Sequence, residues 1–233
     1  MIRIKIWSDF ACPYCYIGER RLVDAINQLG LKDQVEIEYK AFELDPNASC
    51  DGKLTSAERL MNKYGLSREK AKQKVEEISQ LGRELGIDFR YEDSKYSNTF
   101  DAHRLMKLAE DLYDRETVAK LNENLFSAYF TKGLVLAKPE VLMEVGLKSG
   151  LKEIDIDDVL ATESYAPQVR EDEREASMLG VRGVPFMIFN EEFAIPGALS
   201  TEGFVSALEK AQRNSAEESS EKAHKCGSEG CKI

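Results

Sequence analysis

The sequence predicts an α/β protein whose single sheet domain is interrupted by a long all-helical insertion. Residues 2–7 and 35–42 alternate apolar and polar side chains as β-strands do, and the segment between them has helical spacing. Further strand patterns appear only at 186–189 and 193–195, after the long helical stretch of residues 46–179. A chain of 233 residues has the length of one domain with such an insertion.

Charge and hydropathy exclude two classes of partner. The 32 Lys and Arg residues are outnumbered by 42 Asp and Glu, which gives a net charge of −10. Nucleic-acid binding requires a clustered basic footprint, so we expect no nucleic-acid partner. No apolar run reaches the roughly 18 residues of a membrane span, so we expect no membrane contact. The chain begins with a strand pattern rather than a secretory signal, and we expect a cytoplasmic protein.

The five cysteines are more typical of redox or metal chemistry in a reducing compartment than of structural disulfides. Cys12 and Cys15 form a C-x-x-C at the start of the first helical segment, which ends at Gly30. Pro13 suits the first helical turn, where its missing N–H would have no intrahelical partner. Residues 2–42 therefore predict a right-handed βαβ unit with a C-x-x-C opening its helix, which is the thioredoxin-like arrangement.

The start of a helix gives Cys12 the chemistry of a nucleophile. Unpaired backbone N–H groups and the positive end of the helix dipole favour the thiolate, so we expect a pKa below the free value of about 8.5. Cys15 lies one turn further along the same face and is the predicted resolving thiol. Pro13 and Tyr14, between the two cysteines, are predicted to contact substrate and to tune the reduction potential.

Two other interpretations of this cysteine pair remain open. Cys12 and Cys15 could be structural core residues, or half of a zinc site completed by Cys226, Cys231 or His224. The sequence contains no second C-x-x-C to complete a four-thiolate site, so we expect no metal.

The second half of the sheet domain is predicted near the end of the chain. Strands at 186–189 and 193–195 form a hairpin, and a helix follows from Thr201 to about Gln212. We expect a cis Val184–Pro185 bond in the tight turn before the hairpin, which would leave the Val184 backbone free to pair with an extended substrate beside Cys12. An ordinary trans proline is the alternative.

The insertion, residues 46–179, is predicted to cover the C-x-x-C face, form a cleft and determine substrate choice. Within it, Asn98 is a predicted helix cap and His103 is one of only two histidines, and both are candidate substrate-binding residues. His103 could act on Cys12 as a base or a cation, or could be a partly buried packing residue. The predicted helices cover about 55–64, 67–85, 98–112, 116–130, 139–148, 155–161 and 164–179.

Three motifs together resemble the DsbA family of thioredoxin-like oxidoreductases, and specifically its cytosolic FrnE-like branch. They are Ser8-Asp9-Phe10-x-Cys12-Pro13-x-Cys15-Tyr16-Ile17-Gly18, Asn98-Thr99-x-x-Ala102-His103-Arg104, and Gly180-Val-Arg-Gly-Val-Pro185-x-x-x-Phe189. The likeness extends over about residues 2–212. It implies a thioredoxin domain with an inserted helical domain, dithiol–disulfide oxidoreductase or isomerase activity, and catalytic positions at Cys12, Cys15 and Pro185.

The resemblance extends to a second group in the same superfamily. Kappa-class glutathione transferases and 2-hydroxychromene-2-carboxylate isomerases are similar around Asn98 to His103, but they bind glutathione and have Ser in place of Cys12. Possession of both Cys12 and Cys15 favours disulfide exchange. Tyr14 stands where periplasmic DsbA proteins usually have His.

The last residues, 213–233, have few apolar side chains and predict a flexible tail. Cys226 and Cys231 form a C-x4-C there, and we expect this pair to relay thiol–disulfide exchange to or from Cys12 and Cys15. Metal scavenging with His224 and an inert tail are the alternatives. Cys50, in a polar loop, is interpreted as a bystander.

The sequence therefore predicts three units and one favoured activity. The units are a thioredoxin-like domain (1–45 plus 180–212), an inserted helical domain (46–179) and the tail (213–233). The favoured activity is disulfide exchange or isomerisation on a disulfide- or thiol-containing protein or small molecule. No cofactor is expected to be tightly bound, and glutathione or another thiol is a candidate co-substrate. A glutathione-dependent isomerase or transferase and a chaperone-like holdase are the alternatives, in a monomer or homodimer.

Overall fold

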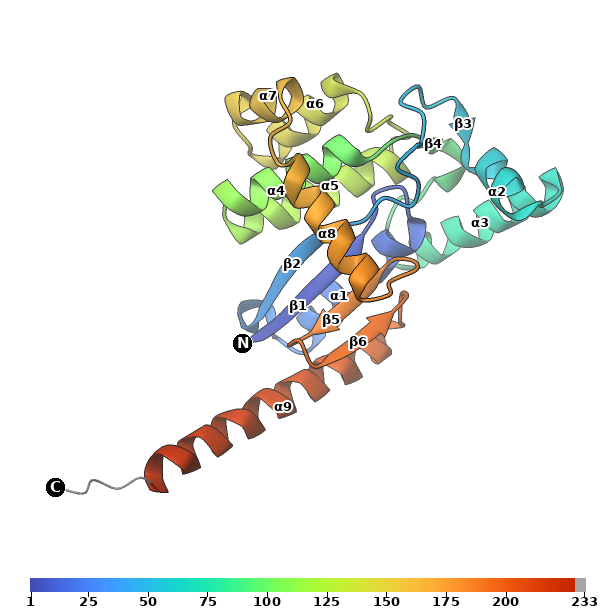
Figure 1. Ribbon diagram of the computed structural model, residues 1–233. Coiled ribbons are helices and arrows are strands. Elements are labelled where there is room, and N and C mark those ends of the chain that lie inside the picture. Colours follow the sequence, from blue (N-terminus) through green and yellow to red (C-terminus); the bar gives the residue numbers. More distant parts are fainter. Residues whose placement is uncertain (229–233) are drawn as a thin grey trace.

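The computed structural model describes the backbone of residues 1–228 and the side chains of residues 1–215. Its centre is a four-stranded sheet in the order β2 (Val35–Ala41), β1 (Ile2–Ser8), β5 (Phe186–Phe189) and β6 (Phe193–Pro196), shown in Figure 1. β1 and β2 are parallel, whereas β5 and β6 are antiparallel to their neighbours. This topology confirms the predicted thioredoxin-like α/β fold with a helical insertion.

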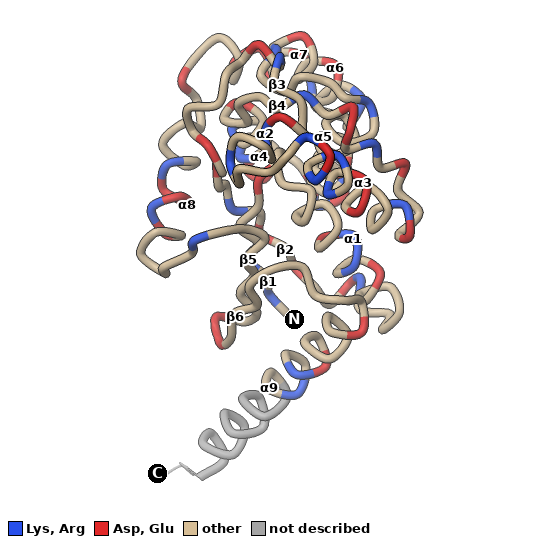
Figure 2. Tube along the Cα trace, turned by 90° about the vertical axis from the view of Figure 1, so that its right-hand side faces the viewer, with Lys and Arg blue, Asp and Glu red and all other residues tan. Residues whose placement is uncertain are grey.

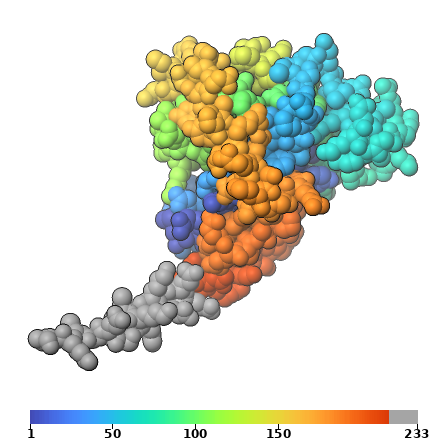
Figure 3. Space-filling model, viewed as in Figure 1, coloured from blue at the N-terminus to red at the C-terminus, as the bar shows by residue number. Residues whose placement is uncertain are grey.

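One face of the sheet is covered by α1 (Pro13–Gln28) and α9 (Thr201–Ser228). The alternation of β1 sends Ile2, Ile4 and Ile6 into this core, where they meet apolar side chains of the two helices. The opposite face is covered by α8 (Ala166–Met178), which lies along β2. Figure 1 shows α8 in front of the sheet, and the same part of the chain lies on the face turned to the viewer in Figure 3. The two parallel strands are thus covered on both faces.

The chain between β2 and β5 forms the helical region. Its helices are α2 (Ser56–Tyr64), α3 (Arg68–Glu84), α4 (Phe100–Leu112), α5 (Arg115–Phe130), α6 (Pro139–Ser149), α7 (Glu153–Ala161) and α8, at bounds close to those predicted. Two 3-10 turns, η1 (Lys32–Gln34) and η2 (Tyr91–Asp93), and a short antiparallel pair, β3 (Leu54–Thr55) with β4 (Lys95–Tyr96), were not predicted. Elements this short carry no periodic signal.

The start of α1 belongs to the core of the helical region rather than to the core on the sheet. Phe10, Cys12, Cys15 and Tyr16 pack there among side chains of α3, α4 and α5. The Tyr16 ring stacks on Phe126, with centroids 5.0 Å apart. The insertion therefore encloses the C-x-x-C end of the helix, as predicted for a domain that covers this face.

The last helix is longer than predicted. A helix end near Gln212 was expected, but α9 continues to Ser228. The residues after Gln212 include Ala, Glu and Lys, which favour helices, and the next glycine is Gly227. A low content of apolar residues indicates the absence of a buried face, and it does not by itself exclude a helix. Cys231 lies outside the described residues, and the side chain of Cys226 is not described.

Charge and hydropathy follow the expected pattern across the described part of the chain. Figure 2 shows acidic and basic residues interspersed along the helices. No helix of the described residues has the length and apolarity needed to cross a membrane.

Candidate active site

Cys12 and Cys15 lie at the start of α1, where the sequence predicted them. Cys12 is the N-cap residue with extended backbone (φ −98°, ψ 112°), and Pro13 occupies the first helical position. The Cys12 N–H donates to the Asp9 carbonyl at 2.9 Å, and the Cys15 N–H donates to the Cys12 carbonyl at 3.1 Å. Both cysteines are unpaired thiols, 5 % and 0 % exposed respectively. Tyr14, between them, is 37 % exposed.

The surroundings shift the pKa values of the two thiols in opposite directions. A hydrogen bond with the Cys15 thiol lowers the pKa of Cys12, against the effect of burial, and the backbone N–H groups of the first turn add to this lowering. Burial, together with the neighbouring Cys12, raises the pKa of Cys15 well above its ordinary value. This asymmetry is what a nucleophile and a resolving thiol require.

The loop before β5 comes close to Cys12. The Val184–Pro185 bond is cis, as predicted. The Cys12 thiol donates to the Val184 carbonyl with an S···O distance of 3.5 Å. Gly18 allows α1 to approach this loop, because a Cβ at that position would lie 3.3 Å from Pro185 Cγ. Residues far apart in sequence therefore meet at one sulfur atom.

The buried carboxyl group of Glu19, next to Cys15 on α1, is a site feature that the sequence analysis did not predict. Glu19 lies one turn after Cys15 on α1 and is 6 % exposed. The Ser8 hydroxyl donates to Glu19 Oε1 at 2.9 Å, and the Asn122 amide donates to Oε2. Burial raises the pKa of Glu19 to about 7, and the two hydrogen bonds oppose this rise. Ser8 also hydrogen-bonds Cys15, so its hydroxyl links the resolving thiol to the carboxyl group.

A sequence signal for Glu19 did exist. Cys15, Glu19, Leu22 and Ile26 recur at helical spacing on the buried face of α1, so a glutamate occupies a core position. A charged residue on an apolar stripe beside a reactive dithiol is a functional-site candidate.

Asp9, three residues before Cys12, is 2 % exposed and fully hydrogen-bonded. It accepts from the N–H groups of Ala11 (3.0 Å) and Leu44 (2.7 Å) and from the Thr99 hydroxyl (2.9 Å). Burial alone would raise its pKa, but His103 and these donors lower it below the ordinary value. The ionised Asp9 in turn raises the pKa of Cys12. Asp9 therefore limits the lowering of the Cys12 pKa, and its hydrogen bonds connect the loop before α1 to Leu44 and Thr99.

His103 reaches the cysteine pair only through Asp9. Its Nε2 lies 3.8 Å from Asp9 Oδ1, and its ring centroid is 4.9 Å from that of Phe10. Nε2 is buried and makes no hydrogen bond to any described residue. The ring packs in the core, as the packing interpretation predicts, and the action of His103 on Cys12 stays a prediction.

Asn98 directs its side chain into the protein scaffold. Its amide donates to Glu43 Oε1 (3.1 Å) and to the Pro46 carbonyl (3.2 Å), and its Oδ1 accepts from the Phe100 N–H (2.9 Å). Although Thr99 is the N-cap residue of α4, Asn98 satisfies a first-turn donor, which is the role of a cap. Substrate binding by Asn98 remains a prediction.

The other singled-out cysteines are not at this site as far as the structure describes them. Cys50 is an exposed thiol in the loop before β3. The expected relay pair, Cys226 and Cys231, lies beyond the described side chains.

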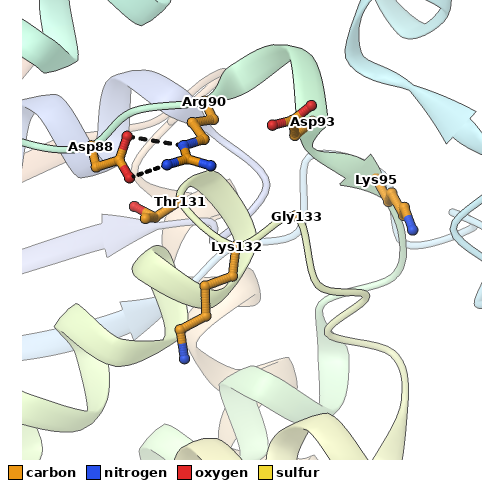
Figure 4. A pocket seen from close by; sticks show the side chains of 7 residues that line it. All are labelled: Asp88, Arg90, Asp93, Lys95, Thr131, Lys132 and Gly133. Carbon is orange, nitrogen blue, oxygen red and sulfur yellow. Dashed lines mark hydrogen bonds and ion pairs between the residues drawn. The ribbon is translucent and has the colours of Figure 1, made fainter.

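A separate surface hollow of about 500 Å³ lies beside the turn after α5. Figure 4 shows its lining, in which Asp88 and Arg90 form a paired side-chain interaction with an N–O distance of 2.8 Å. Thr131, Lys132 and Gly133 form another side of it. None of the predicted site residues lines this hollow.

A βαβ unit with a C-x-x-C at its helix start, a hairpin after a cis-proline and a helical insertion define a DsbA-like thioredoxin domain. Residues 3–209 match the family model described as the DSBA-like thioredoxin domain. The chain belongs to this family.

Solved structures and a curated relative are similar over nearly the whole chain. A probable DsbA oxidoreductase from Streptomyces coelicolor is 34 % identical, with a TM-score of 0.84 over 91 % of this chain and 90 % of that one. The Bacillus subtilis protein YwbO is 24 % identical over 91 % of this chain and 98 % of its own. The cytosolic disulfide reductase DsbM from Pseudomonas aeruginosa, solved with GSH, shares the fold at 16 % identity and a TM-score of 0.62, covering 91 % and 99 %.

A 2-hydroxychromene-2-carboxylate isomerase also shares the fold, at 20 % identity and a TM-score of 0.62, covering 92 % of this chain and 98 % of the other.

Proposed function

We propose that this protein is a thiol–disulfide oxidoreductase or disulfide isomerase of the FrnE-like branch, with Cys12 as nucleophile and Cys15 as resolving thiol. The observation that carries this proposal is the geometry at the start of α1, where Cys12 is the N-cap residue, Cys15 lies one turn further on, and the carbonyl before the cis-proline lies 3.5 Å from the Cys12 sulfur. The opposite directions of the two thiol pKa shifts support it. The thiolate is the reactive form, so Cys12 attacks first and Cys15 stays protonated until it is needed.

The proposed exchange has two steps. The Cys12 thiolate attacks one sulfur of a substrate disulfide, the S–S bond breaks, and the other sulfur leaves as a thiolate. Cys15 then loses its proton and attacks the Cys12 sulfur of the mixed disulfide, which releases the second substrate thiolate. The substrate gains two electrons and the protein gains a Cys12–Cys15 disulfide. A thiol reductant resets the pair for reductase turnover, and attack by a substrate thiol on the mixed disulfide gives isomerisation.

The second step needs a proton acceptor, because Cys15 has a raised pKa. Glu19 is suited to this role, since burial raises its pKa to about 7 and the Ser8 hydroxyl lies between it and Cys15. A group that titrates near neutral pH can both accept and return a proton. We therefore assign Glu19 as the proton acceptor for Cys15 through Ser8.

The Val184 backbone supports recognition of an extended substrate. Its carbonyl is at the Cys12 sulfur and its residue is half-buried beside the pair. Backbone groups at this position can pair with a substrate strand while the disulfide reaches Cys12. The exposed ring of Tyr14 and the neighbouring Pro13, which is buried at the first helical position, are the proposed side-chain contacts.

The test is insulin reduction with a dithiol reductant, followed on single-cysteine variants. Cys12→Ser is expected to fall to the uncatalysed rate, because the nucleophile is lost. Cys15→Ser is expected to accumulate a mixed disulfide at Cys12, which mass spectrometry detects. Cys50→Ser is the control and keeps full activity. Undiminished activity of Cys12→Ser contradicts the mechanism.

Glutathione-dependent isomerisation or transfer on a small organic substrate is the second candidate. The observation that favours it is the fold shared with the isomerase and with the GSH-bound disulfide reductase. Saturable glutathione binding by Cys12→Ser, combined with full isomerase activity in that variant, would favour this candidate over disulfide exchange.

A further inference from the structure

A buried arginine beside the cysteine pair has no anionic partner in contact. Arg59, on α2, is 8 % exposed, and its Nη1 donates to the Ala11 carbonyl at 3.0 Å. Ala11 directly precedes the nucleophile, Cys12. The guanidinium lies over the Tyr96 ring with its Cζ 3.9 Å from the centroid.

The groups around Arg59 are neutral. The Tyr91 side chain forms a hydrogen bond with Arg59, and the charge of Arg59 lowers the pKa of Tyr129 against the effect of burial. Among the side chains that the structure describes, no carboxylate lies within the 4.0 Å of an ion pair with it. The carboxylate that acts on Arg59 across a longer distance is Asp9, whose oxygens already accept three hydrogen bonds.

A second buried arginine shows how this protein normally satisfies such a group. Arg104, on α4, is 4 % exposed. Its guanidinium donates to Asp101 Oδ1 at 2.8 Å, to the Ser164 carbonyl at 2.9 Å and to the Val159 carbonyl at 2.6 Å. Arg59 therefore differs from Arg104 in lacking a carboxylate partner, and none of its guanidinium nitrogens is both buried and without a hydrogen bond.

Burial of a guanidinium without an anion is unfavourable, and such groups are normally paired. Two anions could fill this role at Arg59. One is a carboxylate carried by the substrate, and the other is the Cys12 thiolate. A guanidinium group can donate two parallel N–H···O bonds to a carboxylate, whereas a single sulfur atom cannot accept both in this geometry.

We propose that Arg59 binds a carboxylate of a small disulfide or thiol substrate whose sulfur reacts at Cys12. This inference rests on the proposed function and names the class of substrate: low-molecular-weight disulfides and thiols that carry a carboxylate near the sulfur. The nucleophile is 5 % exposed and the cation 8 % exposed, so a small molecule reaches both more readily than a folded protein does. Arg59 takes part in no covalent step.

The test compares two small disulfides that differ in charge, dithiodiglycolate with two carboxylates and bis(hydroxyethyl) disulfide with none. The measured quantity is the ratio of their kcat/KM values, anionic over neutral. We expect Arg59→Met to lower this ratio by about 10- to 100-fold, the loss of a charged hydrogen bond, through the KM of the anionic substrate. Arg59→Lys is expected to give an intermediate ratio, because it retains the charge without the fork.

Arg115→Met is the matched control, since Arg115 pairs with Glu36 on the surface. It should keep the wild-type ratio. Equal losses with both disulfides in the Arg59 variants, with a raised Cys12 pKa in the ultraviolet absorbance of the thiolate, would assign Arg59 to the thiolate and overturn the proposal. A wild-type protein that reduces both disulfides equally well would also overturn it and leave the proposed function intact. Failure to reduce either disulfide, or insulin, would remove the proposed function itself.

Discussion

Glu19 couples the active site to folding stability, because its carboxyl group is buried without a cation in contact. Its pKa is about 7 in the folded protein, against an ordinary value of 4.5. Between these two values the folded state holds a proton that the unfolded state releases. The stability that Glu19 contributes is therefore fully present below pH 4.5 and is lost as pH rises through 7. The full loss is about 3 kcal/mol, at 1.36 kcal/mol per pKa unit.

Glu19→Gln should remove this pH dependence, because the amide keeps the size of the side chain and does not ionise. The free energy of unfolding of the variant, minus that of the wild type, should increase by about 3 kcal/mol from pH 4 to pH 8. Urea denaturation of the reduced proteins at the two pH values measures it. Parallel pH profiles for the two proteins would show that Glu19 is not the titrating group.

The same substitution should affect catalysis at the resolving step. Without the carboxylate, Cys15 loses its proton acceptor. We therefore expect Glu19→Gln to slow the release of the mixed disulfide by about 100- to 10,000-fold at and above neutral pH, where the wild-type carboxyl group is ionised. Attack by Cys12 should be little changed. Stopped-flow measurement of both steps distinguishes this outcome from a loss of folding, which would slow both.

The two thiols should also differ in reactivity toward alkylating reagents. The lowered pKa of Cys12 and the raised pKa of Cys15 predict that iodoacetamide modifies Cys12 selectively at neutral pH. Mass spectrometry of the reduced Cys50→Ser variant locates the label without interference from the exposed loop thiol. Faster labelling of Cys15 would reverse the assignment of nucleophile and resolving thiol.

At the scale of secondary-structure elements, Asp172 joins the sheet to two helices. This α8 residue is 3 % exposed and accepts from the Ala41 N–H of β2 at 3.0 Å. It also forms ion pairs with Lys40 (3.1 Å) and with Lys107 of α4 (2.8 Å). The Asp172 carboxylate therefore provides a counter-charge to two largely buried lysines and accepts a hydrogen bond from the N–H at the end of β2. These interactions connect α8 and α4 to β2.

Asp172→Ala should destabilise the protein by about 1 to 3 kcal/mol, because the buried Ala41 N–H loses its acceptor and each lysine loses one of its counter-charges. Lys40 keeps Glu38 and Glu175, and Lys107 keeps Glu110. Glu171→Ala is the matched control on the same helix. Its carboxylate is exposed and pairs with Arg174 at the surface, so its removal should change stability by less than about 1 kcal/mol. Chemical denaturation of both variants measures the difference, and similar small effects would show that the network contributes little.

At the scale of the whole molecule, the position of the C-terminal cysteines bears on the predicted relay. The predicted relay needs a flexible chain after Gln212 to bring the cysteine pair to Cys12, whereas the backbone is helical to Ser228. A helix has a fixed direction, and Figure 1 shows α9 running out from the sheet, away from the helical region. A relay within one chain would thus require this helix to open, or the pair would act on another molecule.

The double variant Cys226→Ser/Cys231→Ser tests the relay directly. If the pair passes electrons to the active site, insulin reduction driven by a dithiol reductant should slow by about 10-fold or more, since an intramolecular thiol has an effective concentration in the millimolar range. A Ser219→Ala/Ser220→Ala variant in the same segment is the control. Unchanged turnover in the cysteine variant would end the relay hypothesis.

The sequence was sufficient for features that depend on neighbouring residues. The alternation of residues 2–7, the helical spacing after Cys12 and the hairpin at 186–195 each reflect a period set by backbone geometry. The predicted helix end at Gln212 was wrong, since α9 continues to Ser228. A low content of apolar residues means that a helix has no face to bury, but its backbone hydrogen bonds can still form. The role of Glu19 was missed, although its place on a buried stripe was visible.

Local patterns in the chain predict the C-x-x-C at a helix start, the α/β class and the interrupted sheet, because periodicity and capping depend on neighbouring residues. Three features of the site come from the packing of the folded chain: Val184 meets Cys12, Glu19 and Ser8 lie next to Cys15 in the core, and Arg59 is buried beside Ala11 without an anion. The contacts of Val184 with Cys12 and of Arg59 with Ala11 join residues that are far apart in the chain. Glu19 is only one turn from Cys15, but its raised pKa comes from burial, which depends on tertiary packing. The packing of the insertion onto the start of α1 therefore decided the electrostatics of the site.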